Sequence, residues 1–588
     1  MDRLRKTTII CTLGPAVDDL DSMKELLRGG MNIARFNFSH GDHAEQANRL
    51  EMVRRASAET GIPVGMLLDT KGPEIRTGVM TDDAKVELEA DDRITITTDE
   101  VEGTADRISI TYKQLPGEVG PGKHIFVADG LIDLEVVSVE GSDVHCVVRS
   151  GGTLGSRKNV NIPGVRVSLP AITEKDKQDI AFAIDHGMDF IAASFVRKPS
   201  DVTEIQRILQ ESECSIHVIA KIEDHEGLEN IEEIVRVSQG IMVARGDLGV
   251  QLSVEQIPLA QKRIISACNR QNKPVITATQ MLDSMIHNAD PTRAELTDVA
   301  NAIFDGTDAV MLSGETASGA YPRRATETLH RIAMAVEESP EYLSRCEKYF
   351  SFHQSSSDIG HAIAKAAYLV ARDIEASAIV APTIRGNTPR LLSKFRPRAN
   401  IIAVTTSETA FRQLLLPWGI FPILSEHVTD SELMIQKALQ RALHRGYVER
   451  LDKVVTAAGI PVNSPFPMNT IKVHFLGNIL NRGHRAVGHT CSGRIVKATT
   501  AEEAETAIKG TGDEILLTPT LEPEHRSLLS SVIGVIVEGE TYISPDEAQQ
   551  ANPELVLIAE VPDAVSQFED SQIISLDGGE KIIYEGLL

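Results

Sequence analysis

Residues 218–247 read VIAKIEDHEGLENIEEIVRVSQGIMVARGD. The stretch begins and ends with short apolar runs, at 218–223 and 241–245, and an amphipathic segment joins them. A continuous apolar run is typical of a strand buried on both faces, and such strands form parallel sheets whose crossover connections are helices. The stretch therefore predicts one β-α-β unit in an α/β protein.

The same pattern recurs along the first 313 residues of the chain. Each apolar run is followed by an amphipathic segment, which predicts a repeated β-α unit. Eight such units in one domain indicate an α/β fold built on a (β/α)₈ TIM barrel, whose active site lies at the C-terminal ends of its strands. The eight runs lie at 8–13, 32–37, 64–69, 190–195, 218–223, 241–245, 275–279 and 309–313.

The pattern breaks between the third and fourth runs. Residues 85–149 alternate polar and apolar side chains and contain Gly-rich turns, which predicts an all-β insert. Because this insert leaves and rejoins the barrel at strand ends, we expect a lid over the barrel mouth that excludes water. The predicted domains are the barrel at 1–69 and 164–340, and the lid at 70–163.

A new αβ pattern begins after residue 340. Apolar runs at 378–381, 401–405, 454–457 and 471–473 predict a doubly wound C-terminal domain at 341–475. Short apolar runs at 515–517, 533–537 and 555–558 predict a small appended domain at 476–588.

Charge and composition exclude several classes of function. The formal net charge of −25 and the lack of a basic, aromatic-rich run argue against a nucleic-acid partner. The six cysteines show no spacing typical of zinc sites or disulfide frameworks. Residues 1–6 run directly into a predicted strand, and no apolar stretch is long enough to span a bilayer. These features predict a cytoplasmic protein with no membrane partner.

Polar residues close the barrel runs, often at a spacing of two. Residues i and i+2 of a strand point to the same side, so these side chains should meet in one mouth. The set suits phosphoryl transfer, which depends mainly on positioning and charge neutralisation. Its members are Arg35, Asn37 and Ser39; Asp69 and Thr70; Lys221 and Glu223; Arg245 and Asp247; Thr279; and Ser313 and Glu315.

Six motifs occur in an order and context that resemble the pyruvate kinase family. They are RFNFSH at 35–40, DTKGPEIR at 69–76, AKIE at 220–223, ARGDLG at 244–249, ATQML at 278–282 and LSGET at 312–316. The resemblance covers residues 8–474. It implies transfer of a phosphoryl group from phosphoenolpyruvate to ADP, giving pyruvate and ATP in glycolysis.

The resemblance also implies roles for residues at the mouth. Glu223 and Asp247 would hold Mg²⁺ or Mn²⁺, and two carboxylates suit the octahedral preference of magnesium. Lys221 would stabilise the transferring phosphoryl group, and the backbone N–H groups of Gly246 and Asp247 would bind the substrate carboxylate. Arg35 would hold phosphate oxygens. The proton donor to the enolate stays open: it involves the face on which Thr279 lies, with Ser313 and Glu315 in a hydrated relay.

A potassium site is implied as well. Its oxygens would come from Asn37, Ser39, Asp69 and Thr70. Family members that dispense with potassium tend to carry Lys where this chain has Glu74, so Glu74 predicts potassium dependence. The nucleotide phosphates would contact Arg35 together with Asn37, His40, Arg76 and Lys158.

In the C-terminal domain, the loop at 383–389 joins a predicted strand to a helix. The family uses this loop for a sugar-phosphate or nucleotide effector, so the resemblance implies an effector site. Arg385 stands where the family usually has Ser, and this leaves the effector's identity open. The predicted site residues are Thr383, Arg385, Gly386, Asn387 and Thr388.

The tail resembles the swivelling phosphohistidine domains of phosphoenolpyruvate-utilising enzymes. The family's T-S-H-A signature should fall near 537–544, which contain no histidine. We therefore predict a domain that is not phosphorylated and that serves stability or assembly. The family precedent for assembly is a homotetramer.

Two other functions share part of this pattern. A Mg²⁺-enolate aldolase or lyase would also place a Glu and an Asp at barrel strand ends, but it has no use for a potassium cage or a phosphate-binding lid. A non-catalytic metabolite sensor would be expected to have lost at least one of Lys221, Glu223, Asp247 and Thr279, all of which are present.

Overall fold

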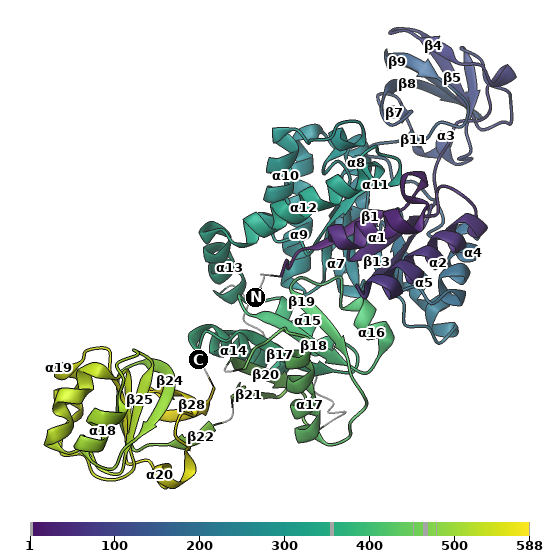
Figure 1. The fold of residues 1–588 in the computed structure, drawn as a ribbon. Coiled ribbons are helices and arrows are strands. Elements are labelled where there is room, and N and C mark those ends of the chain that lie inside the picture. The colour runs from purple at the N-terminus through teal and green to yellow at the C-terminus, as the bar shows by residue number, and fades with distance from the viewer. Residues whose placement is uncertain (1–3, 353–357, 451, 462–467, 478, 587–588) are drawn as a thin grey trace. The chain divides into compact units, whose positions relative to one another are not determined.

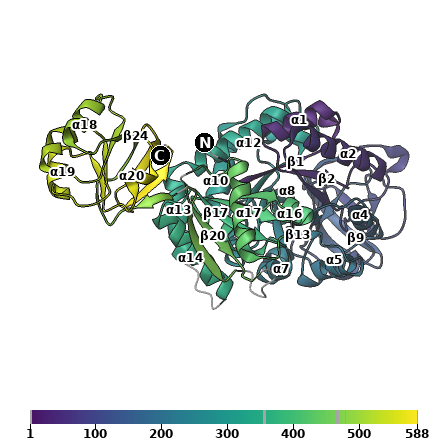
Figure 2. The same ribbon diagram turned by 60° about the horizontal axis from the view of Figure 1, so that its bottom comes forward.

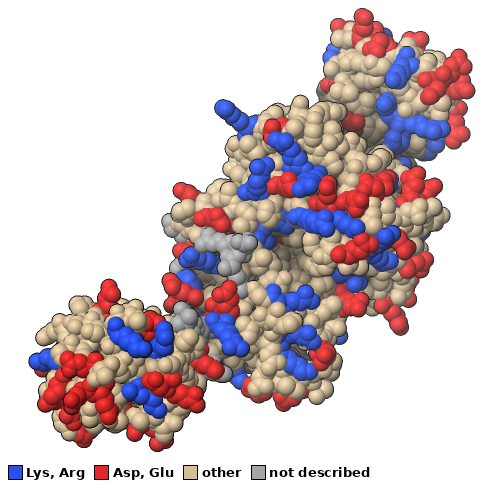
Figure 3. Space-filling view, in the orientation of Figure 1, with Lys and Arg blue, Asp and Glu red and all other residues tan. Residues whose placement is uncertain are grey.

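The computed structural model describes residues 4–352, 358–450, 452–461, 468–477 and 479–586. The chain divides into two compact units. The first comprises Met1–His444 and Val455–Lys472, and the second comprises Arg445–Val454 and Val473–Leu588. On the face shown in Figure 3, acidic side chains form several clusters on the second unit, with basic side chains between them.

A closed eight-stranded barrel forms the centre of the first unit (Figure 1). Every neighbouring pair of strands is parallel. The eight apolar runs of the sequence are these strands, so the barrel prediction is confirmed. In barrel order they are β1 (Thr8–Thr12), β16 (Ala309–Leu312), β15 (Val275–Ala278), β14 (Gly240–Ala244), β13 (His217–Ile222), β12 (Phe190–Ala193), β3 (Gly65–Asp69) and β2 (Ile33–Asn37).

Helices surround the barrel, and their ends follow local sequence signals. The side chain of Asp19 caps the first helix, which stops at Gly30 with a φ of 115°. Capping boxes begin two others, at Thr173 and at Thr292, and satisfy backbone N–H groups that the helix leaves free. The main helices are α1 (Leu20–Gly29), α2 (His43–Thr60), α4 (Glu174–Asp185), α5 (Pro199–Glu211), α7 (Ile231–Val237), α9 (Ile257–Arg270), α10 (Arg293–Asp305) and α12 (Pro322–Glu337).

Apolar side chains fill the barrel interior as a packed core. Ile10, Phe190 and Met242 belong to this cluster, and Leu416 from the C-terminal domain joins it. Because the interior is filled, the barrel is not a pore, and its chemistry is confined to the polar strand ends.

The insert between β3 and β12 is an all-β domain with its own apolar core. It contains a six-stranded sheet in the order β11-β7-β8-β9-β5-β6 and a separate β10-β4 pair. The strands are β4 (Val86–Leu88), β5 (Arg93–Thr97), β6 (Arg107–Ser109), β7 (His124–Val127), β8 (Ile132–Glu140), β9 (Asp143–Ser150), β10 (Gly152–Leu154) and β11 (Val160–Asn161).

The C-terminal α/β domain has a five-stranded sheet in the order β19-β18-β17-β20-β21. Sequence analysis missed β19 (Ile420–Leu424), because Pro422 interrupts its apolar run and proline cannot donate to a sheet. The strand lies at the sheet edge, where proline is tolerated. The other elements are β17 (Ala378–Thr383), β18 (Asn400–Thr405), β20 (Lys453–Ala458), β21 (Thr470–Phe475), α14 (Ile359–Asp373), α15 (Asn387–Ser393), α16 (Glu408–Gln413) and α17 (Ser431–His444).

The tail forms an eight-stranded sheet in the order β22-β29-β28-β24-β25-β26-β27-β23. The three predicted runs are its parallel strands β25 (Glu514–Thr518), β26 (Gly534–Val537) and β27 (Val556–Ala559). Helices α18 (Ala501–Ala507) and α19 (Pro545–Ala551) lie on the same side of the sheet (Figures 1 and 2). The strands that the sequence did not reveal are β22 (Ile479–Arg482), β23 (Arg485–Val487), β24 (Thr490–Lys497), β28 (Ile573–Asp577) and β29 (Ile582–Glu585).

Among the described residues, no helix combines the length and the apolar character needed to cross a membrane.

Candidate active site

Lys221 lies at the centre of the polar cluster that the strand ends build. Its Nζ is 3.0 Å from Asp69 Oδ1 and 3.0 Å from Glu223 Oε1. It also donates a hydrogen bond of 2.7 Å to Ser194 Oγ. Burial lowers the pKa of Lys221, but the carboxylates of Asp69 and Glu223 outweigh that effect and raise it overall. The ammonium is therefore charged and held in place by partners on three sides.

Arg35 reaches the same carboxylate from β2. Its Nε donates to Asp69 Oδ2 at 2.7 Å, and its Nη1 donates to Thr12 Oγ1 at 2.8 Å. Burial alone raises the pKa of Asp69, but the charges of Arg35 and Lys221 reverse the shift and lower it. Asp69 is thus ionised and orients two cations at the mouth.

Glu223 and Asp247 bring two further carboxyl groups to the surroundings of Lys221. Glu223 is only 2% exposed, and it accepts a hydrogen bond from the backbone N–H of Phe195. Burial raises its pKa, Lys221 opposes the rise, and the charge of Asp247 adds to it. The charged groups that act on Lys221 in the described part of the chain thus include three carboxyl groups, those of Asp69, Glu223 and Asp247, and the guanidinium of Arg35.

This donor set fits a hard divalent cation. Carboxylate oxygens are the ligands that Mg²⁺ prefers, and it keeps several waters of its own. Among the described residues, no group of three or more His, Cys, Asp or Glu is arranged to hold a metal. Glu223 and Asp247 offer two carboxyl groups of the kind that such a cation binds.

Thr279 follows β15 in a strained backbone conformation. Its φ is +64°, and Gln280 follows with +54°, values that non-glycine residues seldom adopt. Thr279 Oγ1 donates to the carbonyl of Ala278 at 2.7 Å and accepts from the N–H of Gly246 at 2.8 Å. Arg245, itself paired with Asp298 at 2.6 Å, donates from Nη2 to the carbonyl of Thr279 at 2.5 Å. The buried guanidinium thus maintains the strained turn that presents the hydroxyl.

Ser313 and Glu315 follow β16. Glu315 accepts from the N–H of Ser313 at 2.7 Å and from that of Leu282 at 3.1 Å. Burial raises the pKa of Glu315, and these backbone hydrogen bonds oppose the rise. The hydroxyl of Ser313 is buried without a hydrogen-bond partner in the described part of the chain. An unpaired buried hydroxyl is a typical place for an ordered water.

The predicted potassium ligands gather at the ends of β2 and β3. The sheet register places Asn37 beside Asp69. The carbonyl of Thr70 accepts from Ser194 Oγ at 2.6 Å, and Asn37 Oδ1 accepts from the N–H of Ser39 at 3.1 Å. Amide, hydroxyl, carbonyl and carboxylate oxygens are suitable ligands for a hard monovalent cation.

Glu74 has close cationic neighbours of its own. Its Oε2 is 2.7 Å from Arg76 Nη2 and 3.5 Å from Lys71 Nζ. Arg76 also links the chain segment that enters the lid to the one that returns from it, because its Nη1 donates to the carbonyl of Arg157 at 2.8 Å. Glu74 thus orients one of the residues predicted to bind nucleotide phosphates.

Two of the other predicted nucleotide residues, Lys158 and His40, are exposed, whereas Asn37 is half-buried and Arg35 is buried. Lys158 lies on the chain that returns from the lid, and an antiparallel bridge between Arg76 and Asn159 brings it beside the outgoing chain. His40 follows the end of β2, near the predicted potassium ligands. These side chains are free to reach a ligand that enters from solvent.

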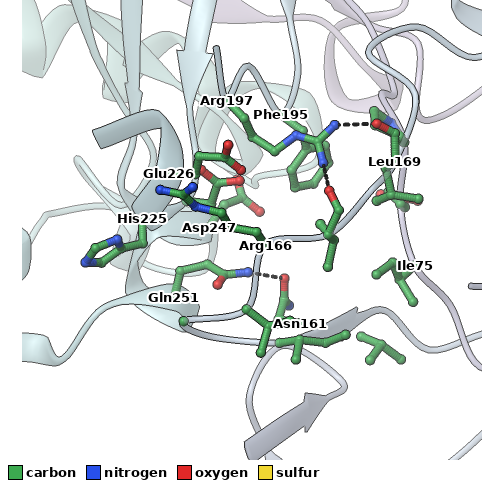
Figure 4. A pocket seen from close by; sticks show the side chains of 18 of the residues that line it. Ile75, Asn161, Arg166, Leu169, Phe195, Arg197, His225, Glu226, Asp247 and Gln251 are labelled. Carbon is green, nitrogen blue, oxygen red and sulfur yellow. Dashed lines mark hydrogen bonds between the residues drawn. The ribbon is translucent and has the colours of Figure 1, made fainter. Parts of the chain in front are cut away.

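A cavity of about 290 Å³ opens beside Asp247, between the barrel and the lid connections (Figure 4). Gln251 Nε2 donates across it to Asn161 Oδ1 at 3.1 Å. Arg197 holds the returning segment, with hydrogen bonds of 2.7 and 2.8 Å to the carbonyls of Val167 and Leu169. The lid connections therefore form one wall of a cavity that Asp247, one of the two predicted metal ligands, also lines.

The predicted effector residues span the turn from β17 to α15: Thr383 ends the strand, and Asn387 and Thr388 begin the helix. Gly386 has a φ of +81°, and its N–H donates to Thr383 Oγ1 at 3.0 Å. Arg385 and Asn387 are exposed, whereas Thr388 is buried. The loop therefore presents only part of the predicted set to solvent.

Sequence reasoning missed three residues that organise the mouth. Ser194 contacts Lys221, Thr12 contacts Arg35, and Arg197 anchors the lid connection. Ser194 and Thr12 each sit at or near the end of an apolar run, and that position was the available signal. Arg197 follows its strand by four residues and carried no such signal.

Comparison with known proteins identifies the family. The family model for the pyruvate kinase barrel domain matches residues 4–326, and the model for the pyruvate kinase alpha/beta domain matches residues 361–474. A pyruvate kinase of Geobacillus stearothermophilus is 44% identical over 588 residues and covers 99% of both chains. The chain belongs to the pyruvate kinase family. Pyruvate kinases of Sporosarcina psychrophila and Bacillus licheniformis are each 42% identical, again over 99% of both chains.

A solved structure of a pyruvate kinase, from Cryptosporidium parvum, agrees in fold. It superposes with a TM-score of 0.77 at 41% sequence identity and covers 80% of this chain and 96% of its own. The enzyme accordingly transfers the phosphoryl group of phosphoenolpyruvate to ADP and yields pyruvate and ATP. The complete set of polar strand ends in the barrel suits that pyruvate kinase reaction.

Proposed function

We propose that the pyruvate kinase reaction takes place at the barrel mouth, around Lys221. The observation that carries the proposal is the buried ammonium held by Asp69, Ser194 and Glu223 at 2.7 to 3.0 Å. The reaction breaks the bond from phosphorus to the enol oxygen, forms a bond from phosphorus to the terminal phosphate of ADP, and adds a proton to the enolate carbon. Fixed positive charge at the transferring group is what such a transfer needs.

Lys221 and Arg35 bind the phosphoryl oxygens first and then, as the bond breaks, the enolate oxygen. Both are pre-oriented by Asp69, so their geometry need not reorganise during the reaction. The backbone N–H groups of Gly246 and Asp247 bind the substrate carboxylate. Before substrate binds, Thr279 Oγ1 accepts from the Gly246 N–H and keeps that donor satisfied.

Glu223 and Asp247 would hold Mg²⁺ or Mn²⁺, in keeping with the surplus carboxylate at the mouth. The bound cation would neutralise charge on the phosphoryl and carboxylate oxygens. Glu223 accepts from the Phe195 N–H and pairs with Lys221. Its second role is therefore to hold the Lys221 ammonium beside the metal site.

Protonation of the enolate carbon is assigned to water held near Thr279. The strained turn at Thr279 presents its hydroxyl to the mouth, and the unpartnered Ser313 hydroxyl offers a further position for water. Glu315, whose pKa is raised by burial, lies within hydrogen-bond distance of the Ser313 backbone and can hold a proton for this relay.

Asn37, Ser39, Asp69 and Thr70 would hold K⁺, and Asn37, His40, Arg76 and Lys158 would contact the nucleotide. The loop with Thr383, Arg385, Gly386, Asn387 and Thr388 would bind a sugar-phosphate or nucleotide effector. We further propose a cytoplasmic homotetramer, following the family precedent. The tail, without a histidine at 537–544, would serve stability or assembly.

The test is pyruvate formation from phosphoenolpyruvate and ADP with Mg²⁺, with and without K⁺ at constant ionic strength. We expect turnover that collapses when K⁺ is replaced by a large organic cation. Turnover that is indifferent to K⁺ would remove the potassium site and leave the reaction in place. Loss of turnover on chelation of divalent cations, restored by Mg²⁺ or Mn²⁺, is the expected result for Glu223 and Asp247.

A further inference from the structure

A second, partly buried charge cluster lies at the opposite end of the barrel from the active site. It surrounds a cavity of about 20 Å³ between the N-terminal ends of the barrel strands and the C-terminal α/β domain. Lys273 lies two residues before β15, and Asp308 immediately precedes β16. Arg390 belongs to α15, and Lys394 and Arg396 follow it. The cavity is therefore built by two domains of the first unit.

Positive charge exceeds negative charge around this cavity. Its lining contains the cations Lys273, Arg390, Lys394 and Arg396 but only one carboxylate, that of Asp308. Asp308 is already engaged, because its Oδ1 lies 3.2 Å from Arg396 Nη2 and accepts from the Trp418 N–H at 3.1 Å. Among the described residues, Lys273, Arg390 and Lys394 form no ion pair within 4.0 Å.

The hydrogen bonds of these three cations are few and go mainly to neutral groups. Lys273 Nζ donates to the carbonyl of Ser238, and Lys394 Nζ donates to the carbonyl of Arg270 at 3.1 Å. Arg390 Nη1 reaches the carbonyl of Arg385 at 3.3 Å, whereas its Nη2 is buried with no partner in the described part of the chain. A buried guanidinium nitrogen without an acceptor is costly, and a bound ligand commonly satisfies it.

The electrostatics agree with the geometry. Burial lowers the pKa of Arg390 to about 10 and that of Lys394 to about 8, with Asp358 opposing the latter shift. Burial also lowers the pKa of Lys273, and the charge of Arg390 lowers it further. The pKa of His217 is held well below 6.5 by burial and by the charges of Arg390 and Lys273. In each case burial is the larger cause, and nearby negative charge does not offset it.

We propose that this cavity binds one small inorganic anion, a halide or a phosphate-type oxyanion, between Lys273, Arg390 and Lys394. The anion would supply the acceptor that Arg390 Nη2 lacks and would neutralise like charges from two domains. A cavity of about 20 Å³ admits a single small ion or water and excludes a nucleotide or a sugar phosphate. The bound anion would therefore stabilise the contact between the barrel and the α/β domain.

Crystals of the full chain soaked in sodium bromide test the site directly. We expect an anomalous bromide peak in the cavity, within hydrogen-bond distance of Arg390 Nη2. A parallel soak in sodium phosphate distinguishes the two ligand types, because a tetrahedral density without a bromide peak would indicate an oxyanion. A cavity that holds only water in both soaks would overturn the proposal.

Thermal unfolding tests the site in solution. At equal ionic strength, the wild type should melt higher in chloride or phosphate than in gluconate, which is too large to enter, by roughly 2 °C. The variants Arg390→Gln and Lys394→Met should lose this gain. Lys177→Met, which removes an exposed lysine at the start of α4, is the matched control and should keep it.

If chloride or phosphate raised the melting temperature equally in the wild type and in both cavity variants, the rise would be a general salt effect. That result would contradict the proposal. If a cavity variant does not fold, the bromide and phosphate soaks of the wild type decide the question alone.

Discussion

The two ends of the barrel contain buried charge clusters of opposite character. At the mouth, Lys221 and Arg35 are paired, and carboxylates outnumber cations. At the opposite end, cations outnumber the single carboxylate of Asp308, and Arg390 Nη2 has no acceptor among the described residues. The mouth residues Arg35, Asp69, Lys221 and Glu223 are buried, whereas Lys273, Arg390 and Lys394 at the opposite end are half-buried. The sign of the unbalanced charge indicates which kind of ligand each end can hold.

The contacts of the cations also differ between the two ends: at the mouth they orient the cations for catalysis, and at the opposite end they favour the binding of an ion. Each cation at the mouth has a carboxylate partner that fixes its direction before substrate arrives, which is what catalysis of phosphoryl transfer requires. The cations at the other end contact mainly neutral carbonyls and retain unsatisfied charge, which favours binding of an ion and offers no reaction to catalyse.

The largest expected effect comes from removing the central cation of the mouth. Lys221→Met should lower kcat by about 10²- to 10³-fold, because it removes a fixed donor to the transferring group. Steady-state pyruvate formation is the measurement. The exposed variant Lys177→Met is the control and should keep wild-type turnover; near-normal turnover in Lys221→Met would remove that residue from the mechanism.

At the other end, Asp308→Asn should lower the free energy of unfolding and leave turnover of the folded enzyme unchanged. The change leaves Arg396 buried without its ion pair at 3.2 Å, at a cost of about 3 kcal/mol in the free energy of unfolding. Urea unfolding monitored by Trp418 fluorescence measures the loss. Asp290→Asn, which removes an exposed partner of Arg324, should change stability by less than about 1 kcal/mol. Equal effects of the two changes would contradict the importance given to burial.

Glu74→Lys tests how a fixed ammonium compares with a bound ion. We expect the ratio of turnover with and without K⁺ to fall by about tenfold, which corresponds to about 1.4 kcal/mol, because the new charge substitutes for potassium. Glu74→Gln removes the carboxylate without adding a cation and should remain potassium-dependent. An unchanged potassium requirement in Glu74→Lys would separate this position from the monovalent-cation site.

The smallest effect concerns pH and Lys394. Its pKa is about 8 in the folded chain and 10.5 for an unperturbed lysine, so between these values the unfolded chain binds more protons. The stability of the wild type should therefore rise with pH across that window, relative to Lys394→Met. The measurement is denaturant unfolding in gluconate buffer, where the neighbouring Lys273, Arg390, His361 and Asp358 remain in place. A constant difference between the two proteins from about pH 7 to 10 would contradict the shifted pKa.

The barrel could be predicted from sequence because each buried parallel strand is a short, continuous apolar run. The edge strand β19 could not, because Pro422 interrupts its pattern. The short strands β22 and β23 of the tail were missed because their residues are exposed or half-buried, so they show no clear apolar periodicity.

For the active site, the spacing of two predicted that Lys221 and Glu223 point to the same side, and they lie 3.0 Å apart at the end of β13. The same rule does not apply to Arg245 and Asp247, because both belong to helix α8 (Arg245–Gln251), and Arg245 turns toward Asp298 instead. The roles of Ser194 and Thr12 depend on contacts between strands that are far apart in sequence, such as the hydrogen bond from Lys221 to Ser194. Serine and threonine are common at strand ends, so their identity alone carries little information.

The sequence by itself determined the β-α order, the chemistry at the strand ends and the pyruvate kinase motifs, because these depend on local periodicity and on residue type. Only the tertiary structure decided which charges are balanced. Asp69 joins Arg35 to Lys221, and Arg390 Nη2 is left without an acceptor among the described residues, because both outcomes depend on which elements meet in space. Charge balance is a property of a packed neighbourhood, and no stretch of sequence contains it.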